Sequence, residues 1–116
     1  MFLTNGPEGS DINLSPQELK AKIDGGEKIL LVDVRDPAEF AFNRIQGAIH
    51  IPLHELARRH KELDPDAGIV TYCHLGVRSL KAAQILKSLE FSNVKHLAGG
   101  IDAWSAQVDV SVPRYR

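Results

Sequence analysis

The chain has very little cysteine. One cysteine among 116 residues excludes an internal disulfide, a Cys-x-x-Cys redox pair and a multi-cysteine zinc site. The first ten residues also lack the basic start and the long apolar stretch of a signal peptide. We therefore expect a cytoplasmic protein with a free thiol.

Long apolar runs and net charge are lacking as well. No run approaches the roughly 20 apolar residues that a membrane-spanning helix needs. The 14 Lys and Arg nearly balance the 15 Asp and Glu, for a net charge of −1, so we expect no broad basic face for nucleic acid. Neither a membrane nor a nucleic acid is therefore expected as a partner.

The composition is that of a globular protein, with 43% hydrophobic and 25% charged residues. A chain of this length predicts one domain over residues 1–116 with a single core. Residues 1–11 are rich in turn formers and predict a mobile lead. Residues 107–116 predict a tail along the surface.

Short apolar runs alternate with segments of helical periodicity. The runs predict strands at 12–14, 29–34, 48–51, 69–72 and 94–97. The periodic segments predict helices at 16–24, 37–42, 53–61, 80–89 and 101–106. Strands that alternate with helices are typical of an α/β fold. We expect a mainly parallel sheet of about five strands with helices on both faces.

The cysteine, Cys73, follows the strand at 69–72 and precedes the helix at 80–89. A strand–loop–helix turn directs several backbone N–H groups at one spot, and the helix dipole adds positive potential there. Such a loop stabilises a thiolate, which is a usable nucleophile, and its N–H groups can hold an anion. The other interpretation of Cys73 is a small buried hydrophobe, and the residues alone leave both open.

Four motifs, in order along nearly the whole chain, resemble the signatures of single-domain rhodanese-like sulfurtransferases. They are Asp33-Val34-Arg35, then Glu39-Phe40 with residues 45–52, then the loop at 73–79, and finally residues 97–104. The resemblance implies a rhodanese-like fold and transfer of sulfane sulfur through a persulfide on Cys73. The donor would be a small anion such as thiosulfate, or another persulfide donor, and the acceptor a thiol, cyanide or a sulfur-carrier protein. Neither a metal nor an organic cofactor is implied.

The resemblance also assigns roles within the loop. His74, Leu75, Gly76, Val77 and Arg78 would bind the substrate, with their backbone N–H groups around the persulfide. Arg78 has two interpretations, one as a cation that holds the anion and one as the partner of a carboxylate that shapes the loop, and we expect both. Because Arg78 is the only permanent charge in the loop, we expect weak affinity for thiosulfate, with added charge when His74 is protonated.

Residues outside the loop have supporting roles in this interpretation. Asp33 and Arg35, at the end of their strand, are expected to brace the loop by hydrogen bonds. Residues 112–115 resemble the tails of rhodanese domains that are fused to enzymes of sulfur-carrier pathways. This short similarity favours delivery of sulfur to a carrier protein.

Two other functions compete with sulfur transfer. The first is a non-catalytic rhodanese-like module that binds a protein partner, which the retained Cys73, Gly76 and Arg78 oppose. The second is a phosphatase or arsenate reductase. The active-site loop of those enzymes is similar to Cys-x5-Arg, in which five residues separate cysteine from arginine and the loop cradles a tetrahedral oxyanion. Here only four residues separate Cys73 from Arg78. The shorter loop suits a single sulfur atom better.

Overall fold

The computed structural model describes residues 12–114. Its centre is a five-stranded sheet in the order β1-β5-β4-β2-β3. All four pairings are parallel, which confirms the predicted fold class. The strands are β1 (Asn13–Leu14), β2 (Ile29–Asp33), β3 (Ile49–His50), β4 (Gly68–Tyr72) and β5 (Val94–Leu97).

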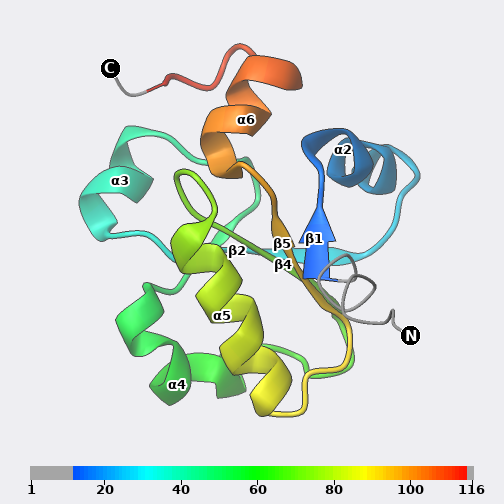
Figure 1. Cartoon of the computed structure of the whole chain (residues 1–116), viewed down its shortest axis with the longest axis vertical. Helices are drawn as coiled ribbons and strands as arrows, with labels where there is room; N and C mark the ends of the chain where they lie inside the picture. The colour runs from blue at the N-terminus through cyan, green and yellow to red at the C-terminus, as the bar shows by residue number, and fades with distance from the viewer. Residues whose placement is uncertain (1–11, 115–116) are drawn as a thin grey trace, which may run out of the picture.

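Helices cover both faces of the sheet (Figure 1). Those in the described part of the chain are α2 (Pro16–Asp24), α3 (Pro37–Phe42), α4 (Leu56–Arg59), α5 (Val77–Ser88) and α6 (Gly100–Gln107). Figure 1 shows α4 and α5 on one side and α2 and α6 on the other. Each side has its own buried apolar cluster, so the inner strands are buried on both faces, as parallel sheets require.

The start of α2 follows from its sequence. Ser15 caps the helix by accepting the N–H of Glu18, and the Glu18 carboxylate accepts the N–H of Ser15. Pro16 occupies the first turn, where no N–H is needed. This reciprocal cap holds the chain at the point where β1 turns into α2.

The helix predicted at 53–61 is wrong in detail. The segment is broken into a 3₁₀ turn η1 (Leu53–Glu55), the single turn α4 and a second 3₁₀ turn η2 (His60–Glu62). The His60 ring donates from Nδ1 to the carbonyl of Ala57 at 2.8 Å, and such a side-chain bond competes with the regular helical pattern. The three-residue spacing of Leu53 and Leu56 also suits 3₁₀ geometry.

Helix α5 begins at Val77 rather than at residue 80. Gly76 forms its N-cap with φ 119°, a conformation that side chains rarely adopt. Val77 is 81% exposed, so it adds nothing to the apolar stripe from which the helix was predicted. The early start brings the first turn of α5 directly after the Cys73 loop.

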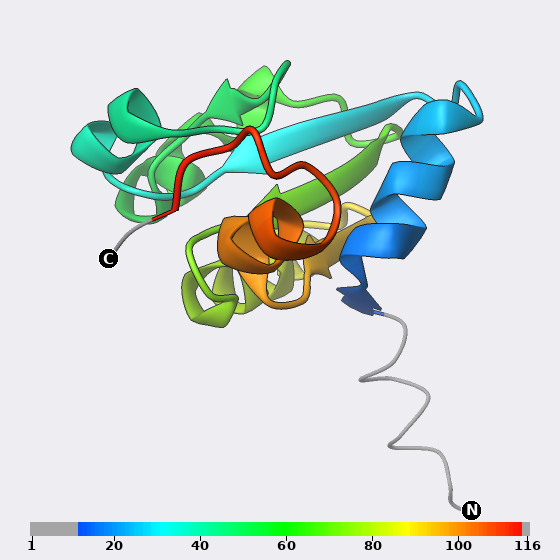
Figure 2. The same ribbon diagram turned by 90° about the horizontal axis from the view of Figure 1, so that it is seen from above.

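The predicted mobile lead at 1–11 lies outside the described residues. The C-terminal segment runs from α6 back toward α3 (Figure 2). Ser105 Oγ donates to the carbonyl of Val112 at 2.5 Å, and the Asn43 amide donates to the carbonyl of Pro113 at 2.6 Å. Arg114 completes the attachment with an ion pair to Asp102.

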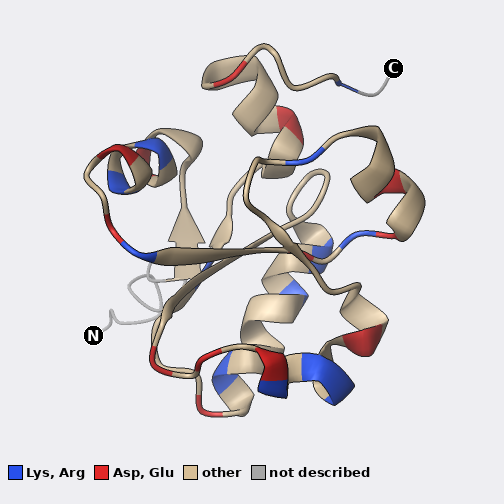
Figure 3. Cartoon of the chain, turned by 180° about the vertical axis from the view of Figure 1, so that it is seen from behind, with Lys and Arg blue, Asp and Glu red and all other residues tan. Residues whose placement is uncertain are grey.

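Charged residues of both signs are interspersed over the helices and connections, while the sheet is largely free of them (Figure 3). Within residues 12–114 no helix has the length and apolar character to cross a bilayer.

A fully buried ion pair lies at the end of β2. Asp33 and Arg35 are both 0% exposed, and Arg35 binds the carboxylate through Nε and Nη2 at 2.7 to 3.2 Å. Arg35 also donates to the side chain and the backbone carbonyl of Asn43. The pair therefore ties β2 to the segment that follows α3, which in turn holds the C-terminal segment.

We expect Arg35→Ala to lower the free energy of unfolding by about 3–5 kcal/mol, because it leaves the Asp33 carboxylate buried without its cation. Urea denaturation measures the change. Arg59→Ala is the matched control, because Arg59 pairs with Glu55 and Glu62 at the surface and should cost far less. Equal losses in the two variants would contradict a structural role for the buried pair.

Candidate active site

Cys73 lies at the carboxyl end of β4, the middle strand of the sheet. Open α/β sheets place their binding sites at this edge. The loop from Cys73 to Gly76 then turns into α5, whose N-terminal end faces the loop. The Cys73 side chain is 1% exposed, so the sulfur sits within the turn rather than on the surface.

Two backbone N–H groups point at the sulfur. Gly76 N–H lies 3.1 Å and Ser79 N–H 3.3 Å from Sγ. Donors in these positions stabilise negative charge on sulfur, and the N-terminal end of α5 adds to their effect. This geometry can stabilise a thiolate or a persulfide anion.

The first turn of α6 holds the outer side of the same loop. The N–H of Ile101 donates to the carbonyl of Cys73 at 2.8 Å, and that of Asp102 to the carbonyl of His74 at 3.2 Å. Gly100, directly before Ile101, has φ 65°, and a Cβ there would overlap the backbone oxygens of Cys73 and His74. The glycine is therefore required by both backbone conformation and close approach.

We expect Gly100→Ala to be more destabilising than Gly47→Ala. Gly47 also has a positive φ, of 87°, but a Cβ there meets nothing within 4 Å, so its cost is about 1 kcal/mol from conformation alone. The overlap at Gly100 should add at least about 1 kcal/mol. Urea denaturation of both variants measures the loss in free energy of unfolding. Equal losses would show that the close contact between α6 and the loop does not require a glycine at position 100.

A pocket of about 200 Å³ opens beside the loop and is lined by Cys73, His74, Leu75, Val77 and Arg78. Leu75 is 59% and Val77 81% exposed, so the rim is apolar on these two sides. Gly76 is buried and does not line the pocket. Four of the five residues predicted to bind substrate thus line one opening, and the fifth, Gly76, directs its N–H at Cys73 Sγ.

Arg78 is paired with a carboxylate from α3. Its two terminal nitrogens bind the two oxygens of Glu39 at 2.7 and 2.9 Å. The hydrogen bonds from Arg78 lower the pKa of Glu39 from 4.5 to about 2, despite opposing desolvation. The guanidinium therefore ties α3 to α5 while one side of it lines the pocket.

We expect this ion pair to contribute stability that acid removes. The pKa of Glu39 is lower in the folded chain than the ordinary 4.5, so its contribution is complete above that pH and is lost as the pH falls toward 2. Glu39→Gln should therefore lose less stability than the unsubstituted chain over this range, while keeping the cap to Asp36 N–H. Urea denaturation of both proteins between pH 4.5 and about 2 measures the free energy of unfolding and its dependence on pH.

Glu90→Gln is the matched control, because it removes an exposed carboxylate just beyond α5. If Glu39→Gln shows the same acid sensitivity as the unsubstituted chain, the Arg78–Glu39 pair makes no such contribution.

Asp33 and Arg35 approach the loop through Tyr72, the residue before Cys73. The Arg35 guanidinium lies 5.8 Å from the centre of the Tyr72 ring, and the Tyr72 carbonyl accepts the N–H of Val34. Burial and the Asp33 carboxylate raise the pKa of Tyr72, so its hydroxyl is protonated. The pair thus supports the strand end, and bracing of the loop itself stays a prediction.

Three residues that sequence reasoning did not select form a second link to the sulfur. Ser79 Oγ lies 3.6 Å from Cys73 Sγ, His96 Nδ1 lies 3.0 Å from Ser79 Oγ, and Asn13 Oδ1 lies 2.8 Å from His96 Nε2. They come from α5, β5 and β1. Ser79 was visible in the loop motif, but His96 and Asn13 become neighbours only through strand order and register.

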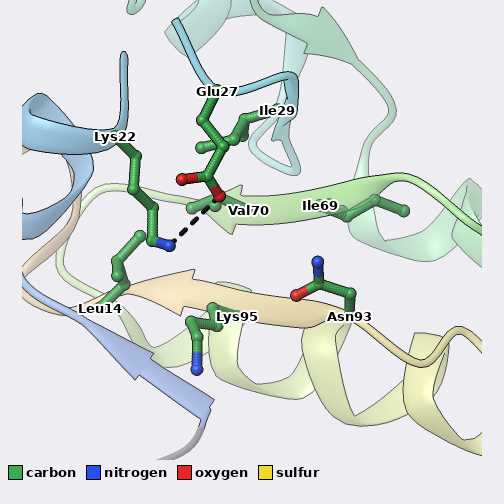
Figure 4. Close-up of a pocket in the computed structure, with 9 residues that line it drawn as sticks. Leu14, Lys22, Glu27, Ile29, Ile69, Val70, Asn93 and Lys95 are labelled. Atoms are coloured by element: carbon green, nitrogen blue, oxygen red, sulfur yellow. Dashed lines mark hydrogen bonds and ion pairs between the residues drawn. The ribbon is translucent and has the colours of Figure 1, made fainter. Parts of the chain in front are cut away.

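Another pocket, of about 20 Å³, lies among the starts of β2, β4 and β5 (Figure 4). Its polar groups include Lys22 and Glu27, which pair with each other at 3.3 Å, and Lys95. Its lining contains no thiol or hydroxyl group, and it lies at the amino ends of the strands, whereas Cys73 follows the carboxyl end of β4. Within the described residues no group of three or more potential metal ligands occurs.

Comparison with known proteins matches residues 15–107 to the model of the rhodanese-like domain. The chain belongs to this family. The motif resemblance is therefore confirmed. A sulfurtransferase of Allochromatium vinosum is 36% identical over 79% of the chain and 86% of that protein. The thiosulfate sulfurtransferase GlpE of Pseudomonas fluorescens is 35% identical over 78% of the chain and 82% of its own length.

Longer proteins contain a similar segment. The probable adenylyltransferase/sulfurtransferase MoeZ of Mycobacterium tuberculosis is 39% identical over 88% of the chain, which spans only 26% of MoeZ. Among solved structures, a rhodanese-related protein of Thermoplasma volcanium superposes with a TM-score of 0.75 at 30% identity, over 83% of this chain and 92% of that one. The rhodanese-like family assignment thus rests on sequence and on fold.

Proposed function

We propose that the chain is a sulfurtransferase that carries sulfane sulfur as a persulfide on Cys73. The observation that carries the proposal is the pair of N–H groups, from Gly76 and Ser79, that meet at Sγ beside an open pocket. Donors fixed in this way stabilise sulfur anions without reorganisation during the reaction. The relatives named sulfurtransferase support the same chemistry.

In the proposed reaction the Cys73 thiolate attacks the outer sulfur of thiosulfate. An S–S bond to Cys73 forms, the S–S bond of the donor breaks, and sulfite leaves with the bonding electrons. An acceptor thiolate then attacks the outer sulfur of the persulfide, and Cys73 leaves as a thiolate. With a single cysteine, no internal disulfide interrupts this cycle.

The side chains around the pocket indicate which sulfur donor and which acceptor it favours. Arg78 is already neutralised by Glu39, which favours weak binding of a dianion such as thiosulfate. The exposed side chains of Leu75 and Val77 suit an acceptor with apolar surface, such as a carrier protein. A relative in Bacillus subtilis is named a putative sulfur carrier protein, which supports a protein among the partners.

The loop geometry disfavours a phosphatase or arsenate reductase. Such a function needs a cation aimed at the oxyanion, whereas both terminal nitrogens of Arg78 engage Glu39. The loop between Cys73 and Arg78 is also one residue shorter than in the Cys-x5-Arg enzymes.

We expect the intact mass of the protein to rise by one sulfur atom after incubation with thiosulfate. A reducing thiol should reverse the gain, and Cys73→Ser should show none while keeping the fold, because the change is nearly isosteric. Circular dichroism checks the fold of the variant. A gain only from a persulfide donor would keep the chemistry and change the donor. No gain from any donor would contradict the proposal and favour a non-catalytic binding module.

A further inference from the structure

A continuous set of polar contacts leads from the sulfur to the edge of the sheet. Cys73 Sγ, Ser79 Oγ, the His96 ring and Asn13 Oδ1 follow one another at 3.6, 3.0 and 2.8 Å. Ser79 is 0% and His96 6% exposed, whereas Asn13 is exposed. The contacts therefore connect the buried thiol to a residue at the surface.

The sheet explains why these side chains meet. His96 is in register with Asn13 of β1 on one side and with Thr71 of β4 on the other. Residues in register point to the same face, here the face covered by α5. Thr71 Oγ1 donates to the carbonyl of Ser79 at 2.8 Å, which holds the first turn of α5 over His96.

The hydrogen bonds give the network a direction. Because Asn13 offers its carbonyl oxygen, His96 carries its proton on Nε2 and presents the lone pair of Nδ1 to Ser79. The Ser79 hydroxyl has two acceptors, and Nδ1 at 3.0 Å is nearer than the Gly76 carbonyl at 3.2 Å. Burial lowers the pKa of His96, which favours the neutral ring with Nδ1 unprotonated but also makes the ring a weaker base, so its role as acceptor rests on the contacts at 3.0 and 2.8 Å.

We infer that His96 is the proton acceptor for Cys73 and acts on it through the Ser79 hydroxyl. The inference rests on the proposed function, since the thiolate is the form that attacks the donor. The thiol proton passes from Sγ to Ser79 Oγ while the proton of that hydroxyl passes to His96 Nδ1. The products are a thiolate, a neutral serine and an imidazolium, so protons and charge balance without another reactant.

The transfer also reverses the hydrogen bonds. Ser79 Oγ–H then donates to the thiolate and His96 Nδ1–H donates to Ser79 Oγ. The sulfur anion thereby gains a third donor beside the N–H groups of Gly76 and Ser79. In this interpretation His96 is a positioning residue that sets the charge state of Cys73 without touching substrate.

The neighbouring charged groups do not compete for this role. Lys95 precedes His96 on β5 and so points to the other face, where it lines the remote pocket of Figure 4. Arg78 precedes Ser79 on α5 and is paired with Glu39. From β1 the group that faces the ring is the uncharged Asn13.

The first test is the pH dependence of Cys73 alkylation by iodoacetamide in the full chain, because only the thiolate reacts. In His96→Gln, which keeps hydrogen-bonding groups but cannot take up a proton, alkylation below the inflection should slow about tenfold. In Asn13→Asp, a carboxylate would stabilise the imidazolium, so alkylation there should be faster than in the unsubstituted chain. His54→Gln, at an exposed histidine, is the matched control and should change nothing.

A purely structural role for His96 cannot produce effects of opposite sign in the two variants. An unchanged profile in His96→Gln, or slower alkylation in both His96→Gln and Asn13→Asp, would overturn the inference. Asn13 is exposed, so Asn13→Asp keeps the test informative even if His96→Gln folds poorly.

The second test follows the His96 ring directly by NMR with isotope-labelled histidine. Below the alkylation inflection the ring signals should show an imidazolium population that matches the thiolate formed by the internal transfer and that disappears as the pH rises through the inflection. At the same pH this population should be missing in Cys73→Ser. Identical ring signals in the unsubstituted chain and in Cys73→Ser below the inflection would also overturn the inference. Neither test uses a sulfur donor, so a failure of sulfur transfer is distinguishable from a failure of the relay.

Discussion

The geometry of the site depends on the contact between the first turn of α6 and the Cys73 loop. Two N–H groups of α6 bind the carbonyls of Cys73 and His74. In a trans peptide the carbonyl and the following N–H point in opposite directions. Holding these carbonyls against α6 therefore turns the N–H groups of His74 and Leu75 away from α6, and it fixes the loop that leads to the N–H of Gly76 at Sγ. The close approach is available only because Gly100 has no side chain.

Partial charges rather than full charges then dominate the surroundings of the sulfur. Arg78 is the only Lys or Arg in the loop, and Glu39 offsets its charge. What remains at Sγ is the two N–H groups and the N-terminal end of α5. Such dipoles stabilise a monoanion well at a sulfur that is shielded from solvent, as the 1% exposure of Cys73 indicates. A persulfide suits this environment better than a dianionic oxyanion does.

The elements that sequence reasoning predicted well are those with local signals. The cap of α2, the alternation of strands and helices along the chain and the position of the Cys73 loop could all be predicted from residue type and spacing. The break of the segment at 53–62 into short helical turns could not be predicted in this way, because it depends on a hydrogen bond from the His60 side chain to the carbonyl of Ala57. The partner of Arg78 was expected to be a carboxylate, but its identity as Glu39 required the packing of α3 on α5. His96 and Asn13 are 83 residues apart in the chain, and only the parallel register of β1 and β5 brings them together.

Burial of Cys73 has two opposite effects, because it favours the persulfide but hinders the release of the thiol proton. A persulfide is favoured where water is scarce, and Cys73 is 1% exposed although it lines an open pocket, so solvent has little access to the thiol proton. A proton acceptor within the protein removes this restriction, and one that is neutral at rest adds no charge to the loop. His96 meets both conditions, because its own burial keeps it neutral and Ser79 places it one hydroxyl from the sulfur. The same packing that shields the sulfur thus places His96 one hydroxyl away from it.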